Sequence, residues 1–287
     1  MLRTLSCRLF CALYFVIALV NPSGFADEKF DQDYIHVTAS YAAASTASTN
    51  ENADDGDLKI AKDVARAVAH YQNELPHWWG IDTKYELSAF TVTAKRGPEI
   101  SETGTTAFTF ENGEVFNWVM HVEGDKELIT GVVAHEMNHV FFAKHFLRPL
   151  PRALDEGAAQ KVETKAYHEK AYRNLVAAAQ NGEIFSFKEM LSQMTYPVGK
   201  DKEDTERLTH IFYPQSLFLV NELLERGDRP TFIRFLQAGC RYDDFGKALF
   251  ETYGITADEF STQCNMSLRK LAKTNRSFLI LKFKPAS

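Results

Sequence analysis

The segment His135-Glu136-Met137-Asn138-His139 places two imidazoles one helical turn apart, with a carboxylate between them. Positions i and i+4 of a helix project from the same face about 6 Å apart, so both ring nitrogens can bind one metal ion at about 2.0 to 2.1 Å. Glu136 is rotated by about 100° from His135, which leaves it free to take a proton from a metal-bound water. This spacing predicts a zinc site with its own general base. The simpler alternative is two histidines packed in an ordinary core helix.

The two histidines need a third partner, because a catalytic zinc ion has three protein ligands and leaves its fourth position to water. Glu156 is the best candidate, since a turn at Pro149 and Pro151 leads into a second helical pattern that returns this carboxylate to the histidine face. The alternative is a solvated carboxylate favoured by the positive end of a helix dipole. Asp155 has two interpretations as well, as a helix-start charge or as a hydrogen-bond partner of a ligand histidine.

These segments resemble the gluzincin metallopeptidases, most closely the peptidase MA-like family, which pairs HExxH with a later P-x-W-L-x-E-G-x-A segment. The second segment corresponds here to Pro151 to Ala158, with Ala153 where the family carries tryptophan or another bulky apolar residue. This difference predicts weaker packing near the third ligand. The resemblance implies a zincin-like fold with Zn²⁺ as the cofactor. It implies that Glu136 is the general base. It also implies that the three metal ligands are His135, His139 and Glu156.

Further along, the segment from Tyr213 to Leu224 is similar to the Y-x-x-S helix of the same family. Gluzincins commonly use a tyrosine to stabilise the oxyanion, and such a donor must lie about 3 Å from the developing charge. Pro214 suits a first helical turn, which predicts Tyr213 at a helix entrance with its hydroxyl facing the cleft. His210 is a second candidate donor. The alternative for Tyr213 is a packing residue with a surface hydroxyl.

The N-terminus has the pattern of an export signal. An apolar run follows Arg3 and Arg8, and small residues at Gly24 and Ala26 fit a cleavage site, which predicts a signal peptide over residues 1–26. A membrane anchor that is never removed is the alternative, although the apolar run is short for a bilayer span. We therefore expect a periplasmic, secreted or extracellular protein with no stable membrane insertion after cleavage.

The charge balance limits the classes of partner. The chain carries 32 basic and 38 acidic residues, and the loss of Arg3 and Arg8 with the signal peptide changes the net charge from −6 to −8. Because this acidic chain has no basic run long enough to follow phosphates, nucleic acid and anionic membranes are disfavoured, and a peptide or protein substrate is expected. Cys240 and Cys264 either form a disulfide between two C-terminal helices or remain as two buried free thiols.

The strand pattern lies before the histidine segment. Alternating residues over 105–110 and 115–122, joined at Asn112-Gly113, predict a hairpin with a tight turn. In gluzincins the sheet edge beside the active helix commonly binds the substrate backbone, and the resemblance places this edge at Phe116 to Val122. The alternative is an ordinary hairpin strand. Asp125 is expected to be the N-cap of the helix that carries the histidines.

At 287 residues and 45% hydrophobic content, the chain can bury one core or two lobes that share one. Helical spacing predicts a helix over 58–75 that Pro76 ends, and mostly helices after Glu156. His145 and His168 lack ligand spacing and are expected at the surface. The predicted fold class is α+β, with a small mixed sheet in an N-terminal lobe, a central histidine helix and a mostly helical C-terminal lobe. The predicted divisions are a strand and flexible acidic loop over 27–57 and a peptidase domain over 58–287, whose lobes are 58–150 and 151–287.

Together these patterns predict an exported zinc metallopeptidase in which Glu136 activates a water. Two alternatives from other classes remain open. One is a catalytically inactive binding or structural module that keeps the fold, which the intact Glu136 argues against, because a ligand-only site needs no base. The other is a zinc hydrolase of a non-peptide amide.

Overall fold

A computed structural model describes residues 28–32, 35–41, 53–82, 90–97 and 100–273. The predicted signal peptide and most of the predicted acidic loop lie outside these residues. The described chain is α+β, with its five strands before residue 125 and only helices after it. The strands are β1 (Glu28–Gln32), β2 (Ile35–Tyr41), β3 (Phe90–Arg96), β4 (Thr103–Glu111) and β5 (Glu114–Gly124). The helices are α1 (Ala53–Trp78), the π-helical turn η1 (Leu128–Val133), α2 (Ala134–Phe146), α3 (Arg152–Lys161), α4 (Lys165–Gln180), α5 (Phe187–Met190), α6 (Lys202–Arg226), α7 (Arg229–Tyr242), α8 (Phe245–Tyr253) and α9 (Ala257–Lys273).

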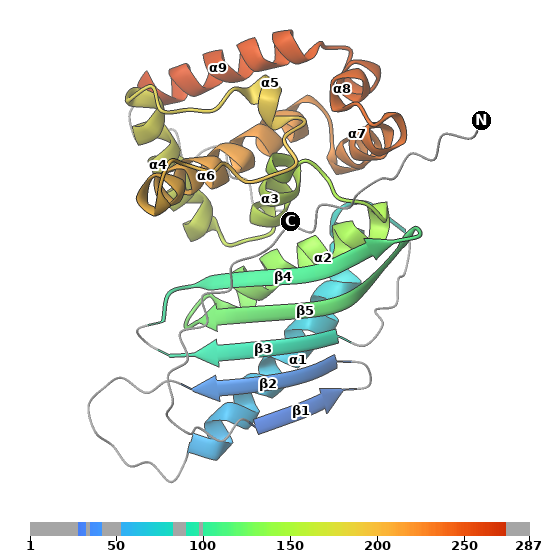
Figure 1. The fold of residues 1–287 in the computed structure, drawn as a ribbon, viewed down its shortest axis with the longest axis vertical. Helices are drawn as coiled ribbons and strands as arrows, with labels where there is room; N and C mark the ends of the chain where they lie inside the picture. The colour runs from blue at the N-terminus through green and yellow to red at the C-terminus, as the bar shows by residue number, and fades with distance from the viewer. Residues whose placement is uncertain (1–27, 33–34, 42–52, 83–89, 98–99, 274–287) are drawn as a thin grey trace, which may run out of the picture.

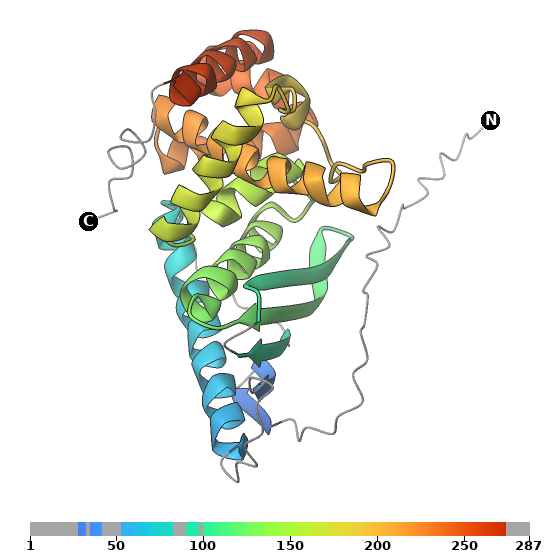
Figure 2. The ribbon, with the colours of Figure 1, turned by 90° about the vertical axis from the view of Figure 1, so that its left-hand side faces the viewer.

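The strands form one mixed sheet in the order β1-β2-β3-β5-β4. The inner strands β2, β3 and β5 are parallel, and β1 and β4 pair with them antiparallel at the two edges. Helices α1 and α2 lie against one face of the sheet, and none of the described helices covers the other face (Figure 1). Helices α3 to α9 form the other half of the molecule, which Figure 2 shows above the sheet.

The predicted hairpin is confirmed, but its edge was assigned to the wrong strand. Asn112 and Gly113 both have positive φ angles, 53° and 77°, as a tight two-residue hairpin turn requires. The segment Phe116 to Val122 lies in β5, which pairs with β3 on one side and with β4 on the other. Because β4 folds back along the free side of β5, the edge next to α2 is β4.

The N-cap position before the histidine helix belongs to a different residue from the one predicted. It is held by Glu127, whose side chain makes no capping hydrogen bond. The Glu102 carboxylate accepts hydrogen bonds from the backbone N–H groups of Asp125 and Glu127, at 2.9 and 3.1 Å. The Asp125 carboxylate lies 3.6 Å from Nε of Arg96 instead. The chain then passes through η1 into α2, which ends at Leu147 in the left-handed conformation. A carboxylate distant in sequence thus binds the backbone that leads into η1.

Helix α1 is longer than its apolar pattern predicts. It begins at Ala53, inside the segment expected to be a flexible loop, and it continues through Pro76 to Trp78. Acidic residues in its first turn favour the N-terminus of a helix. A proline near the C-terminus of a helix removes one backbone hydrogen bond. Here α1 continues for two residues after Pro76.

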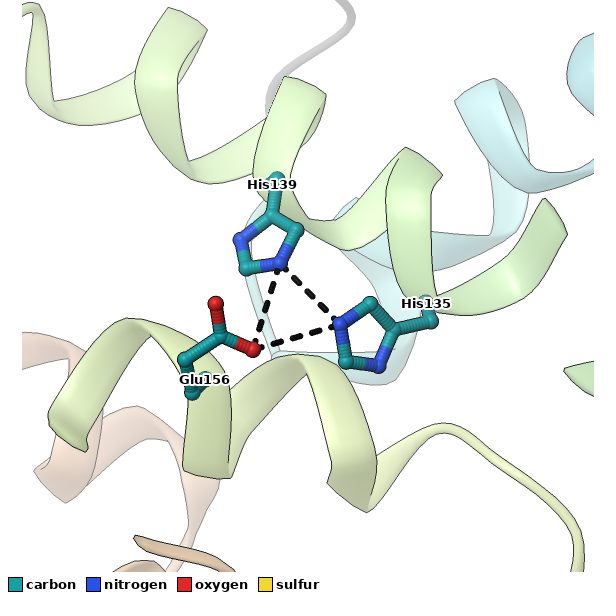
Figure 3. A group of neighbouring side chains, drawn as sticks. All are labelled: His135, His139 and Glu156. Atoms are coloured by element: carbon teal, nitrogen blue, oxygen red, sulfur yellow. Dashed lines mark hydrogen bonds and ion pairs between the residues drawn. The ribbon is translucent and has the colours of Figure 1, made fainter. Parts of the chain in front are cut away.

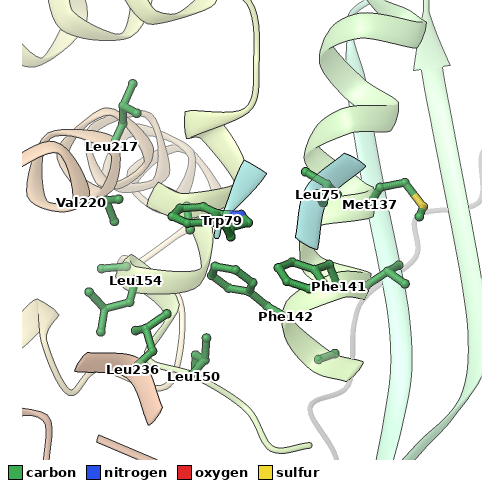
Figure 4. Close-up of a cluster of buried hydrophobic side chains, with 14 of the residues drawn as sticks. Leu75, Trp79, Met137, Phe141, Phe142, Leu150, Leu154, Leu217, Val220 and Leu236 are labelled. Carbon is green, nitrogen blue, oxygen red and sulfur yellow. The ribbon is translucent and has the colours of Figure 1, made fainter. Parts of the chain in front are cut away.

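The core that joins the two halves centres on Trp79, which is fully buried just after α1. Its indole N–H donates to Oδ1 of Asn138, within the histidine segment, at 2.8 Å. Its ring lies against Phe142 of α2 and stacks on Phe232 of α7. Figure 4 shows Trp79 between the side chains of α2 and those of the helical half. Trp79 thus packs α2 against α7 of the helical half.

Helix α6 corrects the position predicted for Tyr213. The helix begins at Lys202, where Asp201 accepts a hydrogen bond from the N–H of Asp204, so Tyr213 lies in its middle and Pro214 is an interior proline. A proline there costs about 3 kcal/mol in isolation. Buried side chains on both sides of it, such as Phe212, pack into the core and offset that cost.

Two further expectations are settled in this half. Cys240 and Cys264 are both free thiols, and Cys264 is buried. The expectation of a surface position was wrong for His168, which is 6% exposed because α4 packs against α6. His145 is half-buried.

None of the described helices is both long enough and apolar enough to cross a membrane.

Candidate metal centre

Three side-chain atoms from α2 and α3 converge on one point (Figure 3). Nε2 of His135 and Nε2 of His139 lie 3.1 Å apart, and Oε2 of Glu156 lies 3.3 and 3.7 Å from them. Ligand atoms of a tetrahedral zinc ion are separated by about 3.3 Å, given metal–ligand bonds of about 2.0 Å. The centre of this triangle lies about 2.0 Å from all three atoms. The three atoms therefore have the spacing of a metal-ligand set.

The outer nitrogen of each histidine is held by a carboxylate. Nδ1 of His135 lies 2.6 Å from Oε1 of Glu163, and Nδ1 of His139 lies 3.0 Å from Oδ2 of Asp155. A carboxylate accepts, so each Nδ1 carries a proton, and in the uncharged form of each ring Nε2 directs a lone pair toward the centre. Two facing lone pairs repel unless a cation lies between them. Of the two interpretations of Asp155, the structure favours the partner of a ligand histidine.

Glu156 is 1% exposed, which excludes the solvated helix-start carboxylate. Its Oε1 accepts a hydrogen bond from the Tyr196 hydroxyl. Its Oε2 is buried and accepts no hydrogen bond, although it faces both histidines. A buried charged oxygen without a donor is costly, and a bound cation would remove that cost. This oxygen is an observation, independent of the distances, that fits a metal ion.

The electrostatics of the cluster also favour a cation. Burial alone would lower the pKa of His135, but the carboxylates of Glu156 and Glu163 raise it to about 10. The pKa of His139 is likewise raised, because Asp155 and Glu156 outweigh the effect of burial. The pKa of Glu156 is lowered by the two histidines, although burial opposes this. A group of three carboxylates around two imidazoles thus attracts positive charge.

Close packing of α3 against α6 positions Glu156. A Cβ atom at Gly157 would lie 2.2 Å from the backbone oxygen of Ser216, so only glycine permits this approach beside Glu156. Ala153, on the same helix, is fully buried in the core. The small residue at position 153 therefore belongs to a packed interface.

Glu136 is 4% exposed and is not one of the converging ligands. Its Oε2 accepts a hydrogen bond from Oγ1 of Thr106, on the edge strand β4, at 2.7 Å. The carboxylate thus lies between α2 and the edge of the sheet. Glu136 thus stays outside the candidate ligand set, although it lies next to His135 in the sequence.

Only one of the two predicted oxyanion donors lies near this cluster. The ring of Tyr213 stacks on Tyr196, with centroids 6.1 Å apart, and Tyr196 in turn contacts Glu156. His210 is exposed and lines a separate cleft of about 490 Å³ between α4 and α6, beside Arg207.

Three residues of the site have no part in the sequence prediction. Glu163 lies just beyond the end of α3, in the short connection to α4, so helical spacing from Glu156 does not predict its position. Thr106 comes from β4 and Tyr196 from the connection between α5 and α6. Neither has a local pattern that points to the metal centre, because only the tertiary fold brings them there.

Comparison with protein-family models finds no match, and comparison with curated proteins finds no significant relative. The geometry of the described residues therefore carries the functional argument, and it establishes a group of His135, His139 and Glu156 suited to a metal ion.

Proposed function

We propose that this chain is an exported zinc metallopeptidase of the gluzincin type. The observation that carries the proposal is the convergence of His135, His139 and Glu156, with Glu136 left free beside them. Two histidines and one glutamate form a donor set typical of catalytic zinc, which leaves its fourth position to water. A site that only binds metal needs no such base. The gluzincin assignment rests on the resemblance of the HExxH and D-E-G segments.

The donor atoms match the ion chemically as well as geometrically. His135 and His139 each offer one nitrogen, which loses its proton when it binds the ion, and Glu156 offers one charged oxygen, a donor set that suits a borderline metal such as zinc. When bound, zinc lowers the pKa of a water toward neutrality and polarises a carbonyl oxygen. Asp155 and Glu163 hold the rings in orientation and increase the basicity of the nitrogens that face the centre.

Glu136 performs the proton transfers in this proposal. Its carboxylate accepts the proton of the attacking water and later gives it to the amine that leaves. Its burial between α2 and β4 keeps bulk water away from that proton. The edge strand β4 offers unpaired backbone groups on its outer side, where an extended peptide can add as a further strand.

Tyr213 is the proposed oxyanion donor, supported by its ring contact with Tyr196 next to Glu156. His210 is left out of the mechanism, because it lines the separate cleft between α4 and α6. Export is proposed from the sequence of residues 1–26 alone.

The test compares wild type with Glu136→Gln, both loaded with zinc, on peptide and non-peptide amide libraries. We expect the variant to keep its zinc and to lose peptide hydrolysis by at least about a hundredfold. Equal activity in both proteins would overturn the proposal. Turnover of non-peptide amides alone would identify the second hydrolase class, and zinc binding without turnover would identify a binding module.

A further inference from the structure

The carboxylate of Glu136 rests on the edge strand of the sheet. Its Oε2 accepts from the Thr106 hydroxyl at 2.7 Å, and the side chain is 4% exposed. Glutamate has three side-chain torsions, and nothing in α2 itself fixes the last of them. The contact with Thr106 therefore determines where the carboxylate oxygens lie.

Gly104, two residues before Thr106, lies against the other oxygen. A Cβ atom at position 104 would come within 2.5 Å of Oε1 of Glu136 and 2.8 Å of a methyl carbon of Val132. The φ angle of Gly104 is not positive, so its backbone does not require glycine. The space occupied by Glu136 is what excludes a side chain at this position.

Both positions belong to one face of β4. Side chains alternate along a strand, so residues 104 and 106 share the face toward α2, and Thr105 between them is exposed on the opposite face. The Thr106 hydroxyl thus binds Oε2 of Glu136, and the absence of a side chain at Gly104 leaves space for Oε1.

We propose that Thr106 is a positioning residue for the general base, and that Gly104 provides the space in which this base is held. The inference rests on the proposed function, but its geometric part does not depend on catalysis. Thr106 acts through Glu136 and does not touch the reacting atoms. The strand that would pair with a peptide substrate thus also orients the base that acts on it.

The first variant, Thr106→Val, keeps the shape of the side chain and removes the donor. We expect kcat to fall about tenfold, with KM within about twofold, because the base is misplaced while substrate binding is kept. Thr106→Ser restores the hydroxyl and should return kcat to near the wild-type value. Thr93→Val, the same change on an exposed position of β3, serves as the control and should leave both constants unchanged.

Gly104→Ala should lower kcat further, by about a hundredfold, because the added methyl group displaces the carboxylate. All variants should retain wild-type zinc content. In a Glu136→Gln background, adding Thr106→Val should cause no additional loss, since the two residues act as one unit.

Crystal structures of the two β4 variants separate this inference from the proposed function. We expect the Glu136 carboxylate to leave its wild-type position in both Thr106→Val and Gly104→Ala, whether or not the protein hydrolyses any amide. If the carboxylate stays in place and, in an active enzyme, kcat is unchanged, the positioning role is overturned. If the wild-type protein hydrolyses no peptide but the carboxylate is displaced in both variants, the proposed peptidase function is refuted and the positioning role of Thr106 and Gly104 is kept.

Discussion

The histidines of the candidate metal centre and the buried His168 have surroundings that change the pKa in opposite directions. At the metal centre, carboxylates outweigh burial and raise the pKa of His135 to about 10. At His168, Nε2 lies 2.7 Å from the backbone oxygen of Gln160, and burial lowers the pKa to about 4. Gln160 and the ligand Glu156 belong to the same helix, α3, one turn apart.

The difference indicates what prepares a histidine to bind a metal ion. Burial by itself favours the neutral ring and disfavours a nearby cation, as at His168. Carboxylates on the outer nitrogens, as at His135 and His139, orient each ring so that Nε2 faces the centre, and they make the surroundings negative. Charge around the ring, rather than depth in the core, distinguishes the metal centre.

The largest expected effect is that of the metal on stability. Zinc at about a thousandfold excess over its Kd should raise the free energy of unfolding of the metal-free protein by about 4 kcal/mol, since the unfolded chain holds no assembled site. Urea unfolding with zinc, and again with a chelator, measures this. His168→Gln should retain the full increment. If the urea midpoint of unfolding is the same with zinc and with the chelator, the histidines of the candidate metal centre do not differ from His168 in binding a metal ion.

The next effect concerns pH at His168. Its pKa in the folded protein, about 4, is below the ordinary value of 6.5, so the unfolded chain binds more protons between these values. The stability that the neutral ring contributes is complete above pH 6.5 and is lost as the pH falls toward 4, by about 3 kcal/mol. His168→Gln should flatten this fall in urea unfolding, while the exposed His210→Gln should not. Parallel pH curves for wild type and His168→Gln would count against a buried neutral ring.

The smallest effect concerns the carboxylates behind the ligands. Asp155→Asn and Glu163→Gln should each weaken zinc binding by about 10- to 100-fold, because each removes the charge that orients and polarises a ligand ring. Competition with a fluorescent chelator measures the affinity. The matched change Glu206→Gln, on an exposed surface carboxylate, should have no effect. Unchanged affinity in both site variants would mean that the ligands alone set the strength of binding.

The parts of the site that the sequence predicts are those with local periodicity. His135 and His139 share a helix face by their spacing, and Glu156 follows from the resemblance of its segment. Thr106 and Tyr196 were not predictable, because each comes from a separate element that only the tertiary fold brings to α2 and α3.

The fold follows the same rule. Local sequence patterns predict the α+β class and the turn at Asn112-Gly113, and both predictions are confirmed. The identity of the edge strand depends on which side of β5 pairs with β3, which no local pattern states. The prediction that a helix begins near Tyr213 was wrong, because packing of α6 overrides the preference of Pro214 for a first helical turn.

The most direct test of the metal centre is the zinc content per chain, measured by elemental mass spectrometry on wild type and Glu156→Gln after identical purification. We expect about one zinc ion per wild-type chain and much weaker retention in the variant, whose amide oxygen is a poor ligand. Glu206→Gln should match wild type. A folded wild-type protein that takes up no zinc, even when zinc is added back, would contradict the account.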